Sequence, residues 1–361
     1  MRWPFLALLA LLTITGLCAL VRVLGRVAGG TARRSRKWFL RASLAGATVV
    51  LAMISLEGLL SVFHVESQGA GVTLASSKWM EKFWRPVNEL GYRDANSIHT
   101  GPQGRRVLWV VGDSHAAGWG IANLSDRLTD RLANALGSAW VVYTIAKPGW
   151  DTRRQIENAA RFPHPPDAVV HLYCLNDAER AAGDLGVVPD PALRDPEGRQ
   201  LQGIWARSYL ADFLVTRWRG FDARRRNAEY WEFIERCFDS PVVWDAHASD
   251  IASLIDAYRR FTSAIVTIII PNLTDPHSSR RLVSKVAGEF ERRGVTTIDL
   301  AETLIAKPID DLIINRFDAH ASPQVHEIMA TRALKALHVM TRSADHLEES
   351  ALSTVLAVET E

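Results

Sequence analysis

The sequence predicts an α/β protein with a parallel sheet of about five strands between two helix layers, preceded by a membrane hairpin. Two observations predict the soluble part: short apolar runs recur from residue 104 onward, and segments with apolar residues at helical spacing alternate with them. Such alternation is typical of a parallel sheet covered on both faces. The third observation is that two long apolar segments precede residue 64.

Residues 1–64 are predicted to form a membrane anchor with two transmembrane helices. Residues 3–21 carry no charge and residues 42–63 carry only Glu57, so each run is long enough to span a bilayer. The short loop between them holds Arg22, Arg26, Arg33, Arg34, Arg36, Lys37 and Arg41. This basic loop is expected in the cytoplasm, which places the chain after residue 64 outside it. A cleaved signal peptide followed by a single anchor is the alternative.

The soluble part reads as five strands separated by helices. The predicted strands are 106–111, 140–145, 167–173, 263–270 and 296–300. The predicted helices are 123–136, 152–161, 276–293 and 323–339. Short, continuous apolar runs such as RVLWVV and SAIVTIII are typical of strands buried on both faces. The predicted arrangement is therefore the flavodoxin-like three-layer α/β/α type.

The remaining segments complete the predicted domain plan. Residues 65–103 are interpreted as a linker, 104–341 as the folded domain and 342–361 as a loose tail. An excursion over about 179–260 is too long for a plain loop and is predicted to form a helical cap or flap. Its helices are expected around Trp205–Trp218, Glu229–Cys237 and Ala248–Arg259.

Composition excludes several classes of function. The chain of 361 residues has 42 Lys and Arg against 40 Asp and Glu, so bulk charge gives no case for nucleic-acid binding. Three cysteines without a Cys-x-x-Cys pair indicate neither a zinc cluster nor a disulfide framework. Cys174 and Cys237 are expected to be buried thiols.

The chemistry is sought at the strand ends, because ligands of open parallel sheets bind there. The first strand ends in Gly112-Asp113-Ser114. A serine at a strand-to-helix turn exposes its hydroxyl and places its own N–H at a helix start, which suits a nucleophile. The same residue can be an ordinary helix cap.

Two further strand ends carry candidate oxyanion donors. Gly149 follows the second strand, where its backbone N–H can approach a ligand, although a simple turn explains it equally. Asn176 follows the third strand, and its side-chain amide can donate to an oxyanion or form a local turn.

A general base is predicted after the fifth strand. A neutral His320 can accept the serine proton, and Asp318, two residues earlier, can orient its ring. A solvated turn is the alternative for this pair. A metal site made from both residues and His326 lacks any recognised ligand spacing.

Together the four blocks resemble those of the SGNH (GDSL-type) hydrolase superfamily, over about residues 88–340. Block one, GDSHAAGWGI, fits the extended GDSxxxGxG form, and SPQVHEIMA resembles the start of the family's closing helix. The resemblance implies an acyl-enzyme mechanism with no cofactor or metal. Ser114, His320 and Asp318 would form the triad, and Ser114, Gly149 and Asn176 the oxyanion hole.

The likeness extends to membrane-anchored bacterial members and also has departures. Glu57 and residues 86–94 (PVNELGYRD) match that branch. The common Asp-x-x-His spacing is shortened here to Asp-x-His, which makes Asp318 the less certain triad member, and Cys174 stands where a glycine is common.

The predicted function is a serine-dependent ester hydrolase or O-acyl (acetyl) transferase acting outside the cytoplasm on acylated glycans. The predicted location is the bacterial inner membrane, multi-pass, with the catalytic domain on the periplasmic or extracellular side. Partners are then the bilayer, an acylated carbohydrate or lipid, and for a transferase a membrane acyl-donor protein. Trp119, Trp150 and His115 neighbour the blocks and are candidates for the substrate pocket. A lipase or lysophospholipase and a non-catalytic carbohydrate-binding module are the alternatives.

Overall fold

The structure is a computed structural model that describes residues 33–69, 73–190 and 203–358. Its centre is a five-stranded sheet in the order β2-β1-β3-β4-β5, with every neighbouring pair parallel. The strands are β1 (Arg106–Gly112), β2 (Trp140–Ala146), β3 (Ala168–Cys174), β4 (Ile265–Ile270) and β5 (Thr296–Asp299). The flavodoxin-like strand order confirms the predicted fold.

Two apolar clusters cover the two faces of the sheet. Alternate residues of each strand point to opposite faces. Along β1, Val107, Trp109 and Val111 therefore join one cluster, while Leu108 and Val110 join the other. Every residue of β3 is buried. This two-sided burial explains why the strands appear in the sequence as continuous apolar runs.

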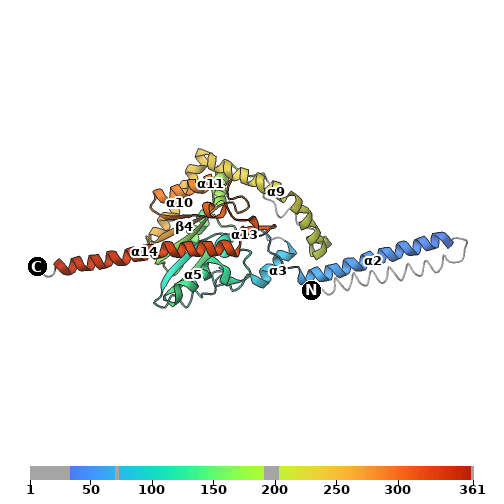
Figure 1. The fold of residues 1–361 in the computed structure, drawn as a ribbon, viewed down its shortest axis with the longest axis horizontal. Coiled ribbons are helices and arrows are strands. Elements are labelled where there is room, and N and C mark those ends of the chain that lie inside the picture. Colours follow the sequence, from blue (N-terminus) through green and yellow to red (C-terminus); the bar gives the residue numbers. More distant parts are fainter. Residues whose placement is uncertain (1–32, 70–72, 191–202, 359–361) are drawn as a thin grey trace.

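Each cluster is closed by its own layer of helices (Figure 1). The first layer contains α6 (Thr152–Ala160), α10 (Pro241–Arg259) and α11 (Arg280–Arg292). The second contains α5 (Leu128–Leu136) and α14 (Pro323–Val358). All four helices predicted between the strands are present, but α14 continues well beyond residue 339, through most of the stretch interpreted as a loose tail.

The long excursion is helical, as the sequence predicts, but its parts have different roles. It contains α7 (Ala178–Asp184), the short helix η5 (Gly203–Arg207), α9 (Tyr209–Asp239) and α10. Two predicted helices merge into the single 31-residue α9. Instead of forming a cap, α10 packs in the first helix layer through residues such as Ile251, Leu254 and Tyr258.

A small hairpin follows β5, in a stretch for which the sequence predicts no strand. After the short helices α12 (Ala301–Leu304) and α13 (Ile309–Leu312), β6 (Ile313–Asn315) pairs antiparallel with β7 (Asp318–Ala321). Strands of three and four residues with polar side chains lack the apolar run by which the longer strands were found. This hairpin carries Asp318 and His320.

The segment interpreted as a linker is packed into the domain. It contains the helix α3 (Leu74–Phe83) and the fully buried Arg93. The guanidinium of Arg93 donates to the carbonyls of Phe83, Gly118 and Ile121 at 2.6–2.7 Å. Arg93 therefore ties this segment to the loop that follows Ser114.

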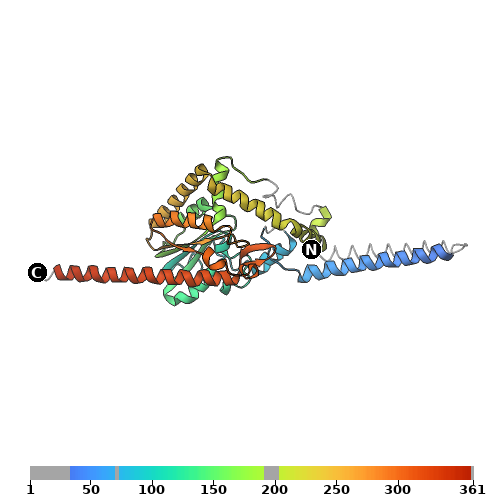
Figure 2. The same cartoon turned by 45° about the horizontal axis from the view of Figure 1, so that its top comes forward.

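The N-terminal described helix, α2 (Arg33–Phe63), projects away from the domain (Figures 1 and 2). Its Arg41–Phe63 stretch is long and apolar enough to cross a membrane, by length and composition. It includes the second predicted span, whereas the first, 3–21, lies outside the described residues. A single apolar helix of this kind also fits a signal sequence.

Candidate active site

The turn that carries Ser114 is built where β1 ends. Asp113 caps the four-residue helix α4 (Ser114–Ala117), and its carboxylate accepts the N–H of His115 at 2.9 Å. Ser114 begins that helix, so its own N–H has no intrahelical acceptor. Its side chain borders a cavity. The turn therefore presents both a hydroxyl and a backbone donor.

Close packing explains why Gly112 and Gly120 of the GDSxxxGxG motif are glycines. A Cβ on Gly112 would lie 2.8 Å from that of Ala116 and 3.0 Å from the carbonyl oxygen of Leu172. Gly120 adopts φ +81°, and a Cβ there would overlap Ile314 and lie 3.1 Å from the Asp318 carboxylate. The motif spacing thus lets the nucleophile loop approach the β6–β7 hairpin closely.

Ser114, His320 and Asp318 form a continuous chain of hydrogen bonds. The Nε2 atom of His320 lies 2.8 Å from the Ser114 hydroxyl, and its Nδ1 atom lies 2.5 Å from Oδ1 of Asp318. Residues i and i+2 of a strand share one face. Because β7 is extended, the Asp-x-His spacing suffices to aim both side chains in one direction. The shortened spacing that made Asp318 uncertain is thus compatible with this contact.

The second oxygen of Asp318 is held by Ser67, which the sequence analysis did not identify. The Ser67 hydroxyl donates to Oδ2 of Asp318, and both residues are buried. Burial would raise the pKa of Asp318, but the hydrogen bonds from His320 and Ser67 outweigh it and lower that pKa. The carboxylate form, which orients an imidazole, is therefore favoured.

The chain segment around Ser67 is fastened to the hairpin by further contacts. Asn315 donates to the Ser67 carbonyl at 3.0 Å, and the Gly69 N–H donates to the carbonyl of Phe317 at 3.0 Å. A separation of 251 residues lies between Ser67 and Asp318. No local pattern in the sequence signals a contact at that distance.

Two other histidines lie near His320 and have different environments. His115 lines the cavity, its ring centroid 5.0 Å from that of His320, and burial lowers its pKa to about 4. It is therefore neutral at physiological pH, and its Nδ1 accepts the N–H of Ala321 at 3.3 Å. His326 is buried and accepts the N–H of Leu128 at 3.1 Å, which ties α14 to α5.

The predicted oxyanion donors are not equally close to the cavity. Asn176 is exposed, follows β3 and lines the cavity together with Ser114. Gly149 lies in the turn after β2 with φ +77° and is exposed, but it is not among the described residues that line the cavity. The oxyanion role of both residues stays a prediction.

The cavity beside Ser114 has a volume of about 230 Å³. Its lining combines Ser114 and His320 with residues of α9 and of the loop after β4. The lining residues are Gly69, Asp113, Ser114, His115, Cys174, Leu175, Asn176, Asn227, Tyr230, Trp231, Ile270, Pro271, Asn272, Leu273, Ala319 and His320.

The aromatic residues of the cavity differ from the predicted ones. Within the described part of the chain, neither Trp119 nor Trp150 lines it. Trp119 is buried beneath His320, with ring centroids 6.1 Å apart, and its indole donates to the Gln68 carbonyl at 3.3 Å. Trp150 packs edge-on against Tyr92. Tyr230 and Trp231 of α9 are the aromatic residues of the lining, and no local pattern in the sequence indicates that the excursion returns to this site.

Comparisons with known proteins add similarities of fold. No family model matches the sequence, and no curated protein matches it. Among solved structures, a lipase/acylhydrolase from Enterococcus faecalis is 14% identical with a TM-score of 0.40, covering 66% of this chain and 96% of that one. A catalytic mutant of an acetylxylan esterase from Geobacillus stearothermophilus is 14% identical with a TM-score of 0.40, covering 65% and 94%.

A carbohydrate acetylesterase family member from Sinorhizobium meliloti is 15% identical with a TM-score of 0.37, covering 65% of this chain and 98% of that one. The chain is similar to the SGNH hydrolases. Its four sequence blocks carry that resemblance, and the roles of its site residues are argued below from their own geometry.

Proposed function

We propose that this protein is a serine-dependent ester hydrolase or O-acyl transferase acting outside the cytoplasm on acylated glycans. The observation that carries the proposal is the hydrogen-bonded chain from Ser114 through His320 to Asp318 at the wall of a cavity. A serine, a base and a buried carboxylate in this order are the parts that acyl transfer requires.

The geometry supports a two-step reaction. As the Ser114 oxygen attacks the ester carbonyl, Nε2 of His320 takes its proton, while Asp318 stabilises the imidazolium that forms. The N–H of Ser114 and the amide of Asn176, with the N–H of Gly149 as a third candidate, would donate to the oxyanion. His320 then returns the proton to the leaving alcohol, and an acyl-enzyme remains. Water or a sugar hydroxyl, deprotonated by His320, attacks that acyl-enzyme, and His320 returns the proton to the Ser114 oxygen as the acyl bond to Ser114 breaks.

The cavity favours a small acyl group on a carbohydrate. Its volume of about 230 Å³ is below the range of about 300–1,000 Å³ typical of larger ligand pockets. Tyr230 and Trp231 offer aromatic surface to a sugar ring, and Asn227 and Asn272 offer polar groups to its hydroxyls. A long acyl chain would need more apolar space than this lining provides, which weighs against the lipase alternative.

The proposed location follows from α2. Its apolar stretch ends at Phe63, and the domain begins directly after it, whereas basic residues gather before it. With that basic end in the cytoplasm, the domain lies on the periplasmic or extracellular side. An acyl transferase at this position would receive its acyl group from a membrane partner.

The test uses the full chain in detergent micelles, because Glu57 of α2 holds the start of α9, the helix that lines the cavity with Tyr230 and Trp231. We expect a serine-reactive fluorophosphonate to label the wild type and the control Ser125→Ala, whose serine is exposed, but not Ser114→Ala. Nitrophenyl acetate should be hydrolysed faster than a long-chain ester. Equal labelling of all three proteins would refute the assignment of Ser114.

The same experiment separates the alternatives. Preference for long-chain esters would favour a lipase, and a wild type that neither reacts nor turns over ester would favour a binding module. Although the Asp-x-His spacing is shorter than the common one, the two side chains reach each other in β7, which weighs against the binding module.

A further inference from the structure

We propose that one face of α9 lies in the membrane interface, as a second contact with the bilayer beside α2. The proposal rests on the proposed anchorage through α2. The α9 face consists of Leu214, Trp218 and Phe221, which follow one another at helical spacing. Their exposed fractions are 56%, 73% and 88%. Adjacent large apolar side chains with this exposure mark an interaction surface, unlike single scattered ones.

The start of α9 is fixed to the end of α2. The Glu57 carboxylate accepts hydrogen bonds from the Ser208 hydroxyl and from the N–H groups of Tyr209 and Leu210, each at 2.8 Å. A carboxylate at these first N–H groups also interacts favourably with the dipole of a long helix. Because Glu57 lies within the apolar stretch of α2, the start of α9 is held at the level of its last turns.

The last turns of α2 are themselves apolar and exposed. Leu59, Val62 and Phe63 are 55%, 62% and 76% exposed. The first half of α9 runs across this end of α2 instead of along it (Figures 1 and 2). A bilayer around α2 would therefore reach its surface beside the first half of α9.

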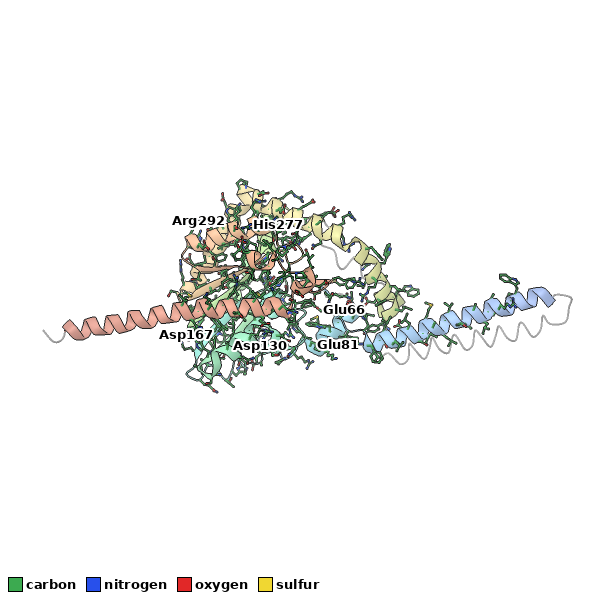
Figure 3. All side chains as sticks on the ribbon, in the orientation of Figure 1. Glu66, Glu81, Asp130, Asp167, His277 and Arg292 are labelled. Carbon is green, nitrogen blue, oxygen red and sulfur yellow. The ribbon has the colours of Figure 1, made fainter. Side chains whose placement is uncertain are left out.

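The neighbouring side of α9 is occupied by the domain, which fixes the rotation of the helix. The ring of Phe213 packs edge-on against His64, with centroids 5.2 Å apart. Arg217 pairs with Glu66 at 3.1 Å and lies over the ring of Phe317. Glu66 appears beside this part of α9 in Figure 3. Each residue of the pair Leu214 and Trp218 directly follows one of the contacting residues Phe213 and Arg217. The α9 face is therefore rotated about the helix axis away from these contacts.

Lipid fits the α9 face better than a second copy of the chain does. Tryptophan is enriched at membrane interfaces, where helices lie with an apolar side towards the acyl chains. Arg225, about one turn after Phe221, keeps 66% of its side chain exposed beside its partner Glu229 and suits anionic headgroups. A second copy would have to displace lipid from around α2 to reach the same side chains.

The contact would set the height of the active site above the bilayer. Tyr230 lies nine residues after Phe221, which corresponds to about 14 Å at about 1.5 Å per helical residue. The cavity lined by Tyr230 would then open close to the headgroups, within reach of a substrate held at the membrane surface.

The experiment measures lipid contact at single positions in the full chain. Cys18 is replaced by Ser, and the buried Cys174 and Cys237 are retained. A cysteine introduced as Trp218→Cys or Phe221→Cys is labelled with an environment-sensitive fluorophore. The protein is reconstituted in two sets of phosphatidylcholine–phosphatidylglycerol vesicles, one with lipids that carry a nitroxide quencher near the headgroup and one with lipids that carry it deep in the acyl chains. Leu51→Cys, in α2, reports on the anchor, and Val242→Cys, 65% exposed in α10, is the matched control.

We expect strong quenching at positions 218 and 221 and little at 242, with position 51 quenched more by lipids whose nitroxide lies deep in the acyl chains. Quenching at 218 and 221 no greater than at 242, while position 51 is quenched, would overturn the proposal. Fluorophore contact between copies that grows with the protein-to-lipid ratio, without lipid quenching, would overturn it in favour of self-association. If the fluorophore at position 51 is not quenched, α2 does not lie in the bilayer, and both the anchorage and this proposal are wrong. The fluorophosphonate labelling of Ser114 tests the proposed reaction independently of this result.

Discussion

The contact between Ser67 and Asp318 predicts that a residue at the end of the membrane-proximal segment controls the pH dependence of the triad. In Ser67→Ala, Oδ2 of the buried Asp318 loses its donor, while Oδ1 keeps His320. The carboxylate is then less stable relative to the protonated acid, so the pKa of Asp318 rises. A protonated Asp318 neither orients the His320 ring nor stabilises its imidazolium.

The expected loss can be bounded from the contact itself. A hydrogen bond to a charged group contributes about 1.5–3 kcal/mol. If that whole amount is lost from the transition state, kcat/KM falls by about 10- to 150-fold. We expect a value in the lower part of this range, because Asp318 keeps its bond to His320.

The assay is kcat/KM for nitrophenyl acetate as a function of pH, using the full chain. In Ser67→Ala the acid limb of the profile should move to higher pH, because carboxylate function is lost earlier as the pH falls. Ser67→Thr, which keeps a hydroxyl, should restore both rate and profile. The control is Ser61→Ala, whose hydroxyl bonds the Gly58 carbonyl within α2.

Two results would contradict this reasoning. One is a Ser67→Ala protein with the rate and pH profile of the wild type. The other is a lower kcat/KM with an unchanged pH profile in both Ser67→Ala and Ser67→Thr, which would mean that Ser67 contributes only to packing. Thermal unfolding measured in parallel shows whether either variant loses the folded state.

Three further predictions concern the triad, the nucleophile loop and buried histidines. Asp318→Asn should lower kcat by about 1,000- to 10,000-fold, because the His320 ring loses its orienting carboxylate. Ser114 of this variant should also react far more slowly with the fluorophosphonate. A rate near that of the wild type would exclude Asp318 as the triad acid. Gly120→Ala should lower the free energy of unfolding by about 2 kcal/mol or more, because residue 120 has a positive φ and the new Cβ would overlap Ile314. Gly137→Ala, at a positive φ but with open space around it, should lower it less, and thermal unfolding of both variants measures the difference. Burial lowers the pKa of His171 and His247 to about 3, so the unfolded chain binds more protons below about pH 6.5. Stability should therefore fall as pH drops from about 6.5 towards 4, by about 1–3 kcal/mol for each histidine, and a flat urea-unfolding profile over that range would contradict it.

The parts of the fold that follow from local sequence were predictable. Strands such as β1 and β4 are continuous apolar runs bounded by glycine or proline, because the sheet is buried on both faces. Ser114 and Asn176 were predictable as site residues because each closely follows a strand that its apolar run reveals. His320 was predictable because it lies shortly before the predicted helix 323–339.

The features that depend on distant contacts were not predictable. The β6–β7 hairpin is too short and polar to show a period, yet it brings Asp318 to His320. Tyr230 and Trp231 reach the cavity from α9, which continues as one helix across Gly220. Trp119, adjacent to the nucleophile block in sequence, is instead packed against Trp79 and Trp84.

The order of the triad along the chain has a consequence for synthesis. Ser114 precedes His320 by 206 residues. At about 5–20 residues per second, the ribosome adds that length in about 10 to 40 s. During this interval the nascent chain carries a serine without its base. Under the proposed mechanism, Ser114 therefore becomes reactive only when the β6–β7 hairpin has been made and has folded against a segment completed near the beginning of translation.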